Sequence, residues 1–173
     1  GYPHVFKIGD PANADDLDSV PNYDDFRQSP YQAEQVGLIV GATCFALRTR
    51  RLQNVRFHTL IFDEAGQITL PLAIAGMQSG RRFVFIGDHR QMGPVLAARH
   101  ANAWVTRSVF ETLFTRSPGT LLNITYRMNA EINAFPSQRF YDDRIQPSNE
   151  ARGARLQLAR PPERFADALD PAY

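Results

Sequence analysis

The sequence predicts an α/β protein whose mainly parallel sheet is flanked by helices. Short apolar runs rich in β-forming residues alternate with segments of helical periodicity, and short loops separate them. Such alternation is typical of strands that are joined through helices and therefore run parallel. In a sheet of this kind, ligands bind beyond the carboxyl ends of the strands. The residues that follow each predicted strand are therefore the first candidates for a functional site.

The first part of the chain contains two predicted strands. Val5–Ile8 is a short strand candidate, and Gly37–Thr43 has the composition of a buried strand that is followed by a helix over Phe45–Leu52. Between the strands lies an acidic segment, about residues 11–30, which prolines interrupt. We expect this segment to be a surface excursion because it is too polar for a core. Tyr31–Gln35 is compatible with a short helix.

The rest of the chain continues the alternation. The apolar spacing after the central strand predicts a helix with one apolar face, and Ser108 is placed to cap a later helix. In order, the predicted elements are a strand over Phe57–Phe62, a helix over Leu70–Gln78, a strand over Phe83–Asp88, a helix over Ser108–Phe114, a strand over Leu121–Ile124, and a helix over Asn129–Tyr141 that is strained or restarted at Pro136. From Gln146 onward the chain shows little periodicity, and we expect it to be irregular.

The composition is that of an ordinary globular protein and excludes few functions. The 173 residues suffice for one domain with a proper core, and the 43% hydrophobic content is ordinary for a globular protein. The net charge of +1 makes no whole-molecule case for nucleic-acid or membrane binding, and no apolar run approaches the ~20 residues of a membrane span. Cys44 is the only cysteine, which predicts a buried, inert thiol and a reducing, cytoplasmic location. Because the first residue is Gly1, we expect a piece of a longer protein.

Two adjacent carboxylates follow the central strand directly. Asp63 could hold a hydrated Mg²⁺, and Glu64 could orient or deprotonate a water molecule. A core strand that ends in a solvated acidic turn would give the same pattern, so the pair alone leaves both interpretations open. If all the strands are parallel, Thr43, Asp88 and Arg127 lie at the same edge of the sheet.

Two further stretches carry polar groups that suit a phosphate. Gly87 permits a sharp exit from its strand, and the amide of Gln91 can donate to a phosphate oxygen without adding charge. We expect His89, in the same loop, to be a surface histidine. The guanidinium of Arg127, between a strand and a helix, could reach a phosphate across a cleft, or could pair with a carboxylate inside the fold.

Four stretches together carry a family resemblance. They are Val40–Ala46, Ile61–Gln67, Gly87–Val95 and Tyr126–Asn129, the last of which is followed by Phe135-Pro136-Ser137 and Phe140-Tyr141. In content and order they resemble consecutive motifs of the superfamily 1 helicases, in the branch of Upf-type and Dna-type enzymes that move 5′ to 3′. The resemblance covers most of the chain from about Val36 to Ile145, and it implies a partial RecA-like motor domain of the P-loop NTPase type.

The resemblance implies roles for individual residues. Asp63 and Glu64 match the Walker B pair, which binds Mg²⁺ and activates the attacking water. Gln91 matches the glutamine that senses the γ-phosphate of ATP, and Arg127 matches the arginine that reaches this phosphate from the second motor domain. The remaining matches are to residues that contact nucleic acid; they are Thr43, near the backbone, and Pro94 and Val95, near the bases.

The departures from the family pattern limit the expected activity. The chain has no Gly-x-x-x-x-Gly-Lys-Ser/Thr loop, which would grip the phosphates of ATP, and its only lysine is Lys7. By resemblance, residues 1–125 are the C-terminal part of the first RecA-like domain, and residues 126–173 begin the second. We therefore expect a helicase fragment that is inactive by itself, whose ATP and Mg²⁺ need residues upstream of Gly1.

Two other functions remain open at the level of sequence. A metal-dependent phosphoesterase could be built on Asp63, Glu64 and Asp88, although two-metal chemistry needs more ligands than these. A non-catalytic nucleic-acid-binding module could use a cluster of basic residues as phosphate contacts; these are Arg48, Arg50, Arg51 and Arg56. The sequence does not separate a DNA substrate from an RNA substrate.

Overall fold

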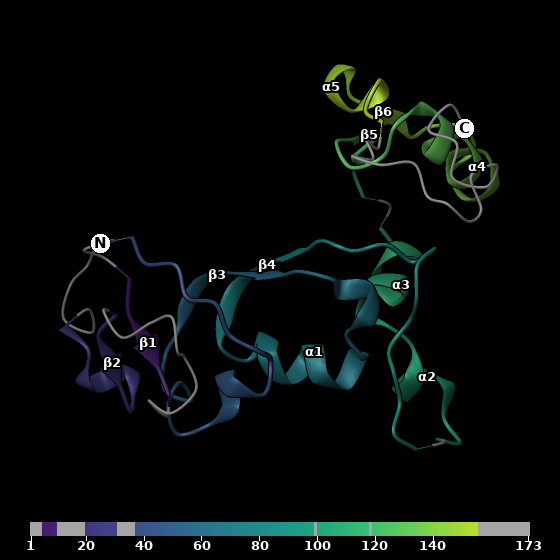
Figure 1. Cartoon of the computed structure of the whole chain (residues 1–173). Coiled ribbons are helices and arrows are strands. Elements are labelled where there is room, and N and C mark those ends of the chain that lie inside the picture. Colours follow the sequence, from purple (N-terminus) through teal and green to yellow (C-terminus); the bar gives the residue numbers. More distant parts are fainter. Residues whose placement is uncertain (1–4, 10–19, 31–36, 99, 118, 156–173) are drawn as a thin grey trace, which may run out of the picture. The chain divides into compact units, whose positions relative to one another are not determined.

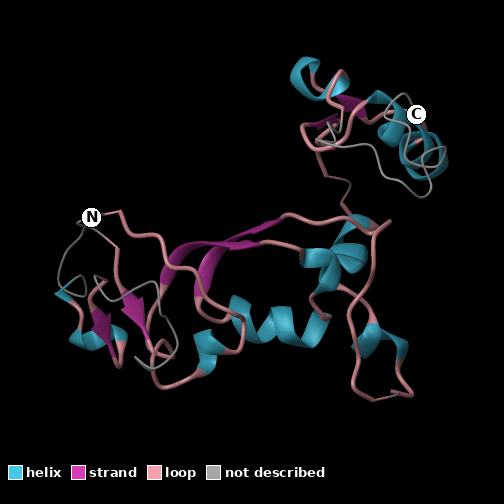
Figure 2. Ribbon diagram, in the orientation of Figure 1, coloured by secondary structure: helices cyan, strands magenta, loops and turns pink. Residues whose placement is uncertain are grey.

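The computed structural model describes residues 5–9, 20–30, 37–98, 100–117 and 119–155 (Figure 1). The chain divides into two compact units, residues 1–118 and residues 119–173. Each of the three sheets in the described part of the chain has two strands, and all three pairings are parallel. The α/β class that the sequence predicts is therefore confirmed (Figure 2). The helix expected over Tyr31–Gln35 lies outside the described residues.

A strand–helix–strand segment forms the centre of the first unit. Strand β3 (Phe57–Phe62) leads through α1 (Leu70–Met77) to β4 (Gly80–Phe85), which pairs with β3 along its length. The strand predicted over Phe57–Phe62 and the helix predicted over Leu70–Gln78 are confirmed as β3 and α1. The second strand begins three residues earlier than predicted, because its register starts opposite Phe57 and takes in Arg81 and Arg82, and it ends at Phe85 rather than at Asp88.

The main hydrophobic core lies between this sheet and its helices. The rings of Phe62 and Phe85, from neighbouring strands, stack with centroids 4.9 Å apart. Ala65, Ala73 and Val109 are completely or almost completely buried against Phe62. Residues from both strands, from α1 and from the start of α3 thus share one core.

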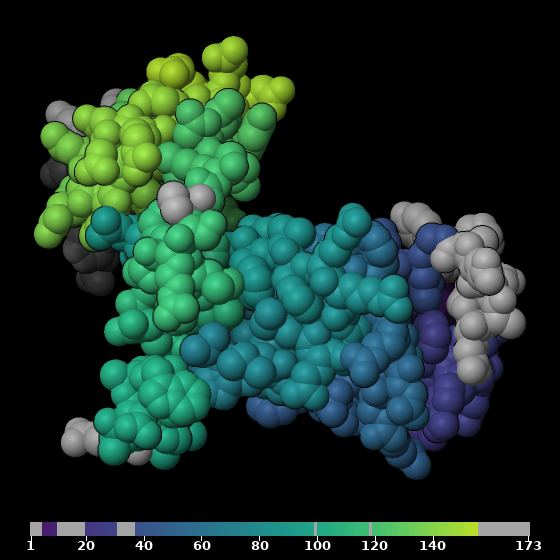
Figure 3. Space-filling view, turned by 180° about the vertical axis from the view of Figure 1, so that it is seen from behind, coloured from purple at the N-terminus to yellow at the C-terminus, as the bar shows by residue number. Residues whose placement is uncertain are grey.

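Helix α3 (Val109–Phe114) packs against this core through Val109 and Phe110. The hydroxyl of Ser108 accepts a hydrogen bond from the backbone N–H of Glu111 (3.0 Å), as the sequence predicts for this cap. The loop between β4 and α3 carries a short helix that was not predicted, α2 (Ala103–Thr106), and this loop extends outward from the sheet (Figures 1 and 3).

The N-terminal part of the unit corrects three expectations. Residues 37–43 form no strand, and Ile39 is 98% exposed, because no strand of the described residues pairs with this stretch. The helix expected over Phe45–Leu52 is only a 3₁₀ turn, η4 (Ala46–Arg48), followed by turns. Strand β1 (Lys7–Ile8) is a shortened form of the predicted N-terminal strand.

The acidic segment is not wholly a surface excursion, which is a further correction. Its described part contains β2 (Asn22–Tyr23), which pairs with β1, and a 3₁₀ turn, η2 (Phe26–Gln28). Phe26 is only 8% exposed and forms a second core cluster with Leu47 and Leu52. The aromatic side chain of Phe26 thus anchors the described part of this acidic segment in a core.

The second unit is built around one helix. α4 (Ala130–Tyr141) begins at Asn129, whose side-chain oxygen accepts a hydrogen bond from the N–H of Ile132 (2.9 Å). The helix continues through Pro136, so of the predicted strain or restart the restart is wrong. The other elements of the unit are β5 (Ile124–Thr125), β6 (Gln146–Pro147) and α5 (Asn149–Arg152).

Two expectations for the second unit are wrong in part. The strand predicted over Leu121–Ile124 is reduced to the two residues of β5, because only these pair with β6. Within the described residues 146–155 the chain forms β6 and α5 rather than being irregular, and Ser148 caps α5 by accepting from the N–H of Ala151 (3.1 Å). The rest of the tail that was predicted to be irregular lies outside the described residues. No helix within the described ranges is long and apolar enough to cross a membrane.

Candidate functional site

The first half of the candidate site is the turn that leaves β3. Glu64 has a left-handed backbone (φ 49°, ψ 40°), which is uncommon for a residue with a side chain. Its N–H donates to Oδ1 of Asp63 (3.0 Å), and the amide of Gln67 donates to its Oε2 (3.3 Å). Both carboxylates are exposed. The turn therefore presents two negative charges to solvent at the carboxyl end of a parallel strand.

The second half of the site is the loop that leaves β4. Asp88 is half-buried, and its carboxylate organises the residues after it. Oδ1 accepts from the backbone N–H of Arg90 (2.8 Å), and Oδ2 accepts from the side-chain amide of Gln91 (2.9 Å). The position of the Gln91 amide therefore depends on Asp88.

Backbone contacts hold the two halves together. The N–H of Ala65 donates to the oxygen of Ile86 (2.8 Å), so the β3–β4 ladder continues into the first residues of both loops. A Cβ at Gly66 would lie 2.6 Å from the oxygen of Asp88, and one at Gly87 would lie 2.7 Å from the nitrogen of Gly66. Such distances leave no room for a side chain. Glycine at both positions allows the two loops to pack backbone against backbone.

An aromatic stack ties the second loop to α3. The ring of His89 lies 4.5 Å from that of Phe114, and Phe114 lies 5.9 Å from Phe110. His89 is exposed, as expected, but it is also a packing residue, which sequence reasoning missed. The available signal was the spacing of the two phenylalanines, four residues apart on one helix face.

The structure groups only part of the predicted sheet-edge set. Asp63, Glu64 and Asp88 follow the paired strands β3 and β4, as predicted. Thr43 does not follow a strand; its hydroxyl accepts from the N–H of Ala46 (3.2 Å) at the start of η4. Arg127 follows β5, which pairs with β6 in a different sheet of the second unit, so the prediction of one common edge is wrong for both residues.

The other predicted residues lie on exposed loops. The side chain of Arg127 is exposed, and its N–H donates to the hydroxyl of Thr125 (3.3 Å). Pro94 is half-buried, and Val95 is 96% exposed, in the loop that extends from the sheet between β4 and α2. An apolar residue so exposed is available to a flat apolar ligand such as a base.

The chemistry of the site suits a hydrated divalent cation better than a protein-enclosed metal centre. Mg²⁺ takes oxygen ligands, keeps several waters, and is commonly held by one or two carboxylates together with phosphate oxygens. Asp63 and Glu64 supply carboxylates of this kind. Among the residues that the structure describes, no group of three or more His, Cys, Asp or Glu side chains could hold a metal ion. A phosphoesterase centre built on Asp63, Glu64 and Asp88 is therefore not favoured.

Comparison with known proteins matches two consecutive parts of the chain. Two family models, each described as an AAA domain, match residues 31–99 and residues 105–171. The regulator of nonsense transcripts 1 homolog of Drosophila melanogaster is 32% identical over 144 residues, which is 80% of this chain and 12% of that protein. The ATP-dependent helicase NAM7 of Saccharomyces cerevisiae is 33% identical over 111 residues, 62% of this chain and 11% of that protein.

A further relative combines two activities in its name. The human DNA replication ATP-dependent helicase/nuclease DNA2 is 32% identical over 111 residues, 63% of this chain and 10% of that protein. The chain thus spans about a tenth of the length of these relatives.

Proposed function

The chain belongs to the superfamily 1 helicases, and from that premise we propose that it is part of an ATP-driven motor that moves along nucleic acid. One observation carries the proposal. The turn after β3 and the loop after β4 are locked together through Gly66 and Gly87, so two exposed carboxylates and an amide that Asp88 positions come from two loops in direct contact. This is the arrangement that a Mg²⁺–nucleotide complex needs from the carboxyl edge of a parallel sheet.

Asp63 and Glu64 take the roles of a Walker B pair in this proposal. Asp63 holds Mg²⁺ through water, and Glu64 orients and deprotonates the water that attacks the γ-phosphate. When bound, Mg²⁺ supplies positive charge to the phosphate oxygens. The left-handed backbone of Glu64 supports its role, because strained residues with side chains concentrate at functional sites.

Gln91 acts as the sensor of the γ-phosphate. Its amide can donate to a phosphate oxygen without adding charge to the site. Because the same amide now donates to Asp88 at 2.9 Å, contact with a phosphate exchanges one acceptor for another. We propose that this exchange moves the loop that carries Pro94 and Val95, and so links nucleotide state to contacts with the bases.

Arg127 serves the same phosphate from the second unit. We propose that residues 1–125 belong to the first RecA-like domain and that residues 126–173 begin the second. Arg127 then contributes in the manner of an arginine finger, which is worth about 10³–10⁵ in rate where nucleoside triphosphatases use one. Thr43 contacts the nucleic-acid backbone in this proposal. A reducing cytoplasmic location, which we also propose, agrees with the single cysteine.

The test compares this chain with a longer protein that supplies the phosphate loop. The 173 residues contain no Gly-x-x-x-x-Gly-Lys-Ser/Thr sequence, so the purified chain should not turn over ATP with Mg²⁺. The longer protein should hydrolyse ATP, and Glu64→Gln in it should lower kcat about 10²- to 10⁴-fold, as loss of a general base does. Glu150→Gln, a change of the same kind in the second unit, is the matched control.

Robust Mg²⁺-dependent turnover of ATP by the 173-residue chain would contradict the proposal. So would a longer protein in which Glu64→Gln and Glu150→Gln behave alike. The two rival functions are not favoured, because the relatives of this chain are ATP-dependent helicases. Cleavage of a phosphodiester by the chain with a divalent metal, lost on Asp88→Ala, would revive the phosphoesterase.

A further inference from the structure

Arg127 lies in a short loop, residues 126–128, that joins β5 to α4 in the second unit. Its side chain is exposed, and no acceptor among the described residues binds its guanidinium. The ion pair inside the fold that the sequence left open is therefore not found in the described part of the chain. A long side chain that no partner orients depends on the backbone of its loop for its direction.

The first end of this loop is fixed by the pairing of β5 with β6. The N–H of Ser148 donates to the backbone oxygen of Thr125 (2.8 Å), beside the register pair of Thr125 and Pro147. The hydroxyl of Thr125 also accepts from the N–H of Arg127 (3.3 Å). The strand pairing thus sets where the loop begins, and a side chain of the same strand holds its second residue.

The second end is fixed by Asn129, which uses both atoms of its amide. Oδ1 accepts from the N–H of Ile132 (2.9 Å) and caps α4, while Nδ2 donates to the backbone oxygen of Ala154 (2.9 Å), 25 positions further along the chain. An aspartate would cap the helix equally well, but it has no donor for the second bond. Asparagine at this position therefore does more than begin a helix.

Arg155 ties the same distant segment to the first turn of α4. Its Nη2 lies 2.6 Å from Oε1 of Glu131, and its Nη1 donates to the oxygen of Ala154 (3.0 Å). The side chains of Arg155 and Glu131 are 38% and 48% exposed, so this ion pair alone adds little stability. Together with the bond from Asn129, it joins residues 154–155 to the end of the loop that carries Arg127.

We propose that Asn129 is a positioning residue, whose bond to Ala154 fixes the loop that carries Arg127. The ion pair of Glu131 with Arg155 supports this bond by holding Ala154 in place. The inference rests on the proposed function, because that function gives Arg127 a phosphate to reach. Asn129 itself touches no substrate. An arginine misplaced by about 1 Å loses much of its effect on the rate, so the bond matters to turnover although it is far from the chemistry in sequence.

Two substitutions remove the bond to Ala154 and keep the helix cap. Asn129→Asp retains an acceptor for the N–H of Ile132 but has no donor, and Asn129→Ser is a capping residue with a shorter, uncharged side chain. In the longer protein that supplies the phosphate loop, each should lower kcat about 10- to 10²-fold and change KM for ATP less than about 2-fold, as expected for a misplaced group that acts in the transition state. Arg127→Ala should lower kcat by at least about 10³-fold.

Combination with Arg127→Ala separates positioning from a general structural role. Without the arginine there is nothing to position, so Asn129→Asp should change kcat less than about 2-fold in the Arg127→Ala protein. Losses of the same factor with and without Arg127 would overturn the proposal. An Asn129→Asp protein with the kcat of the unmodified protein would overturn it too, and would leave the proposed function intact.

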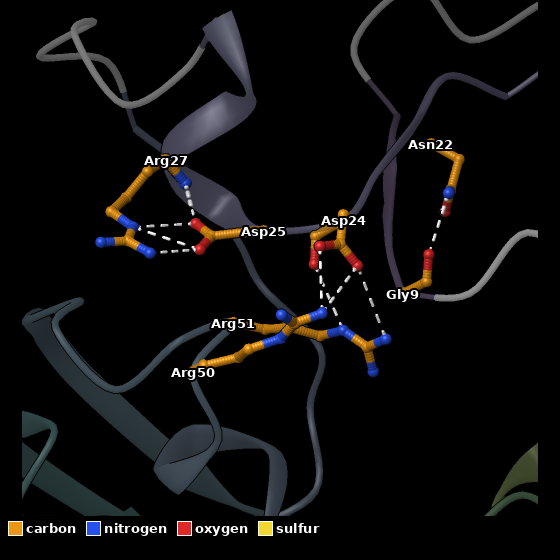
Figure 4. Close-up of polar contacts among 7 residues, drawn as sticks. All are labelled: Gly9, Asn22, Asp24, Asp25, Arg27, Arg50 and Arg51. Carbon is orange, nitrogen blue, oxygen red and sulfur yellow. Dashed lines mark hydrogen bonds and ion pairs between the residues drawn. The ribbon is translucent and has the colours of Figure 1, made fainter.

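The supporting ion pair has a matched control in the first unit. Glu131→Gln should lower kcat only about 2- to 5-fold, because an exposed pair contributes little. Asp24→Asn is the same kind of change: Asp24 is 49% exposed, against 48% for Glu131, and it binds Arg50 across 26 positions of the chain (Figure 4). The control should leave kcat unchanged. Equal losses in the two variants would overturn the part that the proposal gives to Glu131.

The order of the loop in the 173-residue chain is a readout that does not depend on ATP. Amide nitrogen relaxation should give residues 126–128 order parameters of about 0.85, the value of a rigid backbone, and Asn129→Asp should lower them towards about 0.6. Unchanged order parameters would overturn the proposal and leave the proposed function untouched. An Arg127→Ala protein with the kcat of the unmodified longer protein would instead contradict the proposed role of Arg127, and the positioning role with it.

Discussion

The backbone oxygen of Asp88 occupies the space that a side chain at Gly66 would need: a Cβ built there lies 2.6 Å from it. At Gly87, the corresponding Cβ would meet the backbone nitrogens of Gly66 (2.7 Å) and Ala65 (3.1 Å). Because the obstructing atoms are backbone, rotation of a side chain cannot relieve either clash. The separation of the two loops of the candidate site is thus set by two glycines.

Gly66→Ala and Gly87→Ala should each destabilise the chain by about 1–3 kcal/mol, the usual cost of forcing extra volume into a packed region. Gly93→Ala, in the same loop region as Gly87, has nothing within 4 Å of its Cβ and should change stability by no more than about 0.5 kcal/mol. Urea unfolding followed by circular dichroism measures all three. Similar midpoints for Gly87→Ala and Gly93→Ala would show that the close approach is not maintained in solution.

At position 64, the usual order of stability of alanine and glycine variants should be reversed. A left-handed backbone penalises any residue with a Cβ, so Glu64→Gly should be more stable than Glu64→Ala by about 1 kcal/mol. At Glu111, inside α3, the order should be the normal one, with glycine about 1 kcal/mol worse than alanine. Thermal unfolding of the four variants decides the point. If alanine is the better residue at both positions, Glu64 is not left-handed in solution.

Acidification should remove the stability that the ion pair of Asp25 with Arg27 contributes. The side chain and the backbone N–H of Arg27 bind its carboxylate and lower its pKa from 3.8 to about 2. A carboxyl whose pKa is lower in the folded chain stabilises it fully above the unfolded pKa, and this contribution disappears as the pH falls from about 4 to about 2. Asp25→Asn should therefore be less stable than the unmodified chain at pH 7, and the difference should shrink over that interval.

The unfolding midpoint of both proteins, measured from pH 7 to pH 2, tests the sign as well as the size of this effect. Asp142→Asn removes an exposed carboxylate with a looser partner, and its midpoint at pH 7 should lie close to that of the unmodified chain. A difference between Asp25→Asn and the unmodified chain that grows towards low pH would contradict the assignment.

Ser108 should contribute as a helix cap. Its hydroxyl accepts from the N–H of Glu111, and Ser108→Ala removes this acceptor from a buried helix terminus at a cost of about 1 kcal/mol. Ser108→Gly should cost only about a few tenths of a kcal/mol, because glycine suits the cap backbone. Chemical unfolding compares the two, with Ser117→Ala, an exposed serine beyond α3, as the reference.

Cys44 should react slowly with thiol reagents. Burial raises the pKa of its half-buried thiol, so less thiolate is present at neutral pH than in an exposed cysteine. Alkylation should be slower in the folded chain than in urea and should accelerate as the pH rises. Equal rates in both conditions would show that the thiol is freely accessible.

The sequence was sufficient where structure depends on neighbours along the chain. Caps such as Ser108 and Asn129 are local signals, and the helices that they begin were predicted correctly. Elements that depend on distant partners were not. The apolar stretch 37–43 is no strand because nothing described pairs with it, and β4 starts early because β3 sets its register.

The candidate site divides in the same way. Placement of Asp63, Glu64 and Asp88 at one sheet edge followed from a general rule about parallel strands. The contact between Gly66 and Gly87, and the hydrogen bond of Asn129 to Ala154, join residues that are 21 and 25 positions apart. No periodicity or spacing in the sequence predicts such contacts, because they arise only when separate segments pack.

The stack of His89 on Phe114 has a mechanical consequence. Phe114 is the last residue of α3, and the chain passes into its second unit only a few residues later. Any displacement of the loop that carries His89 is therefore resisted by the end of a helix rather than by solvent. The rings of His89, Phe110 and Phe114 thus couple the loop after β4 to α3.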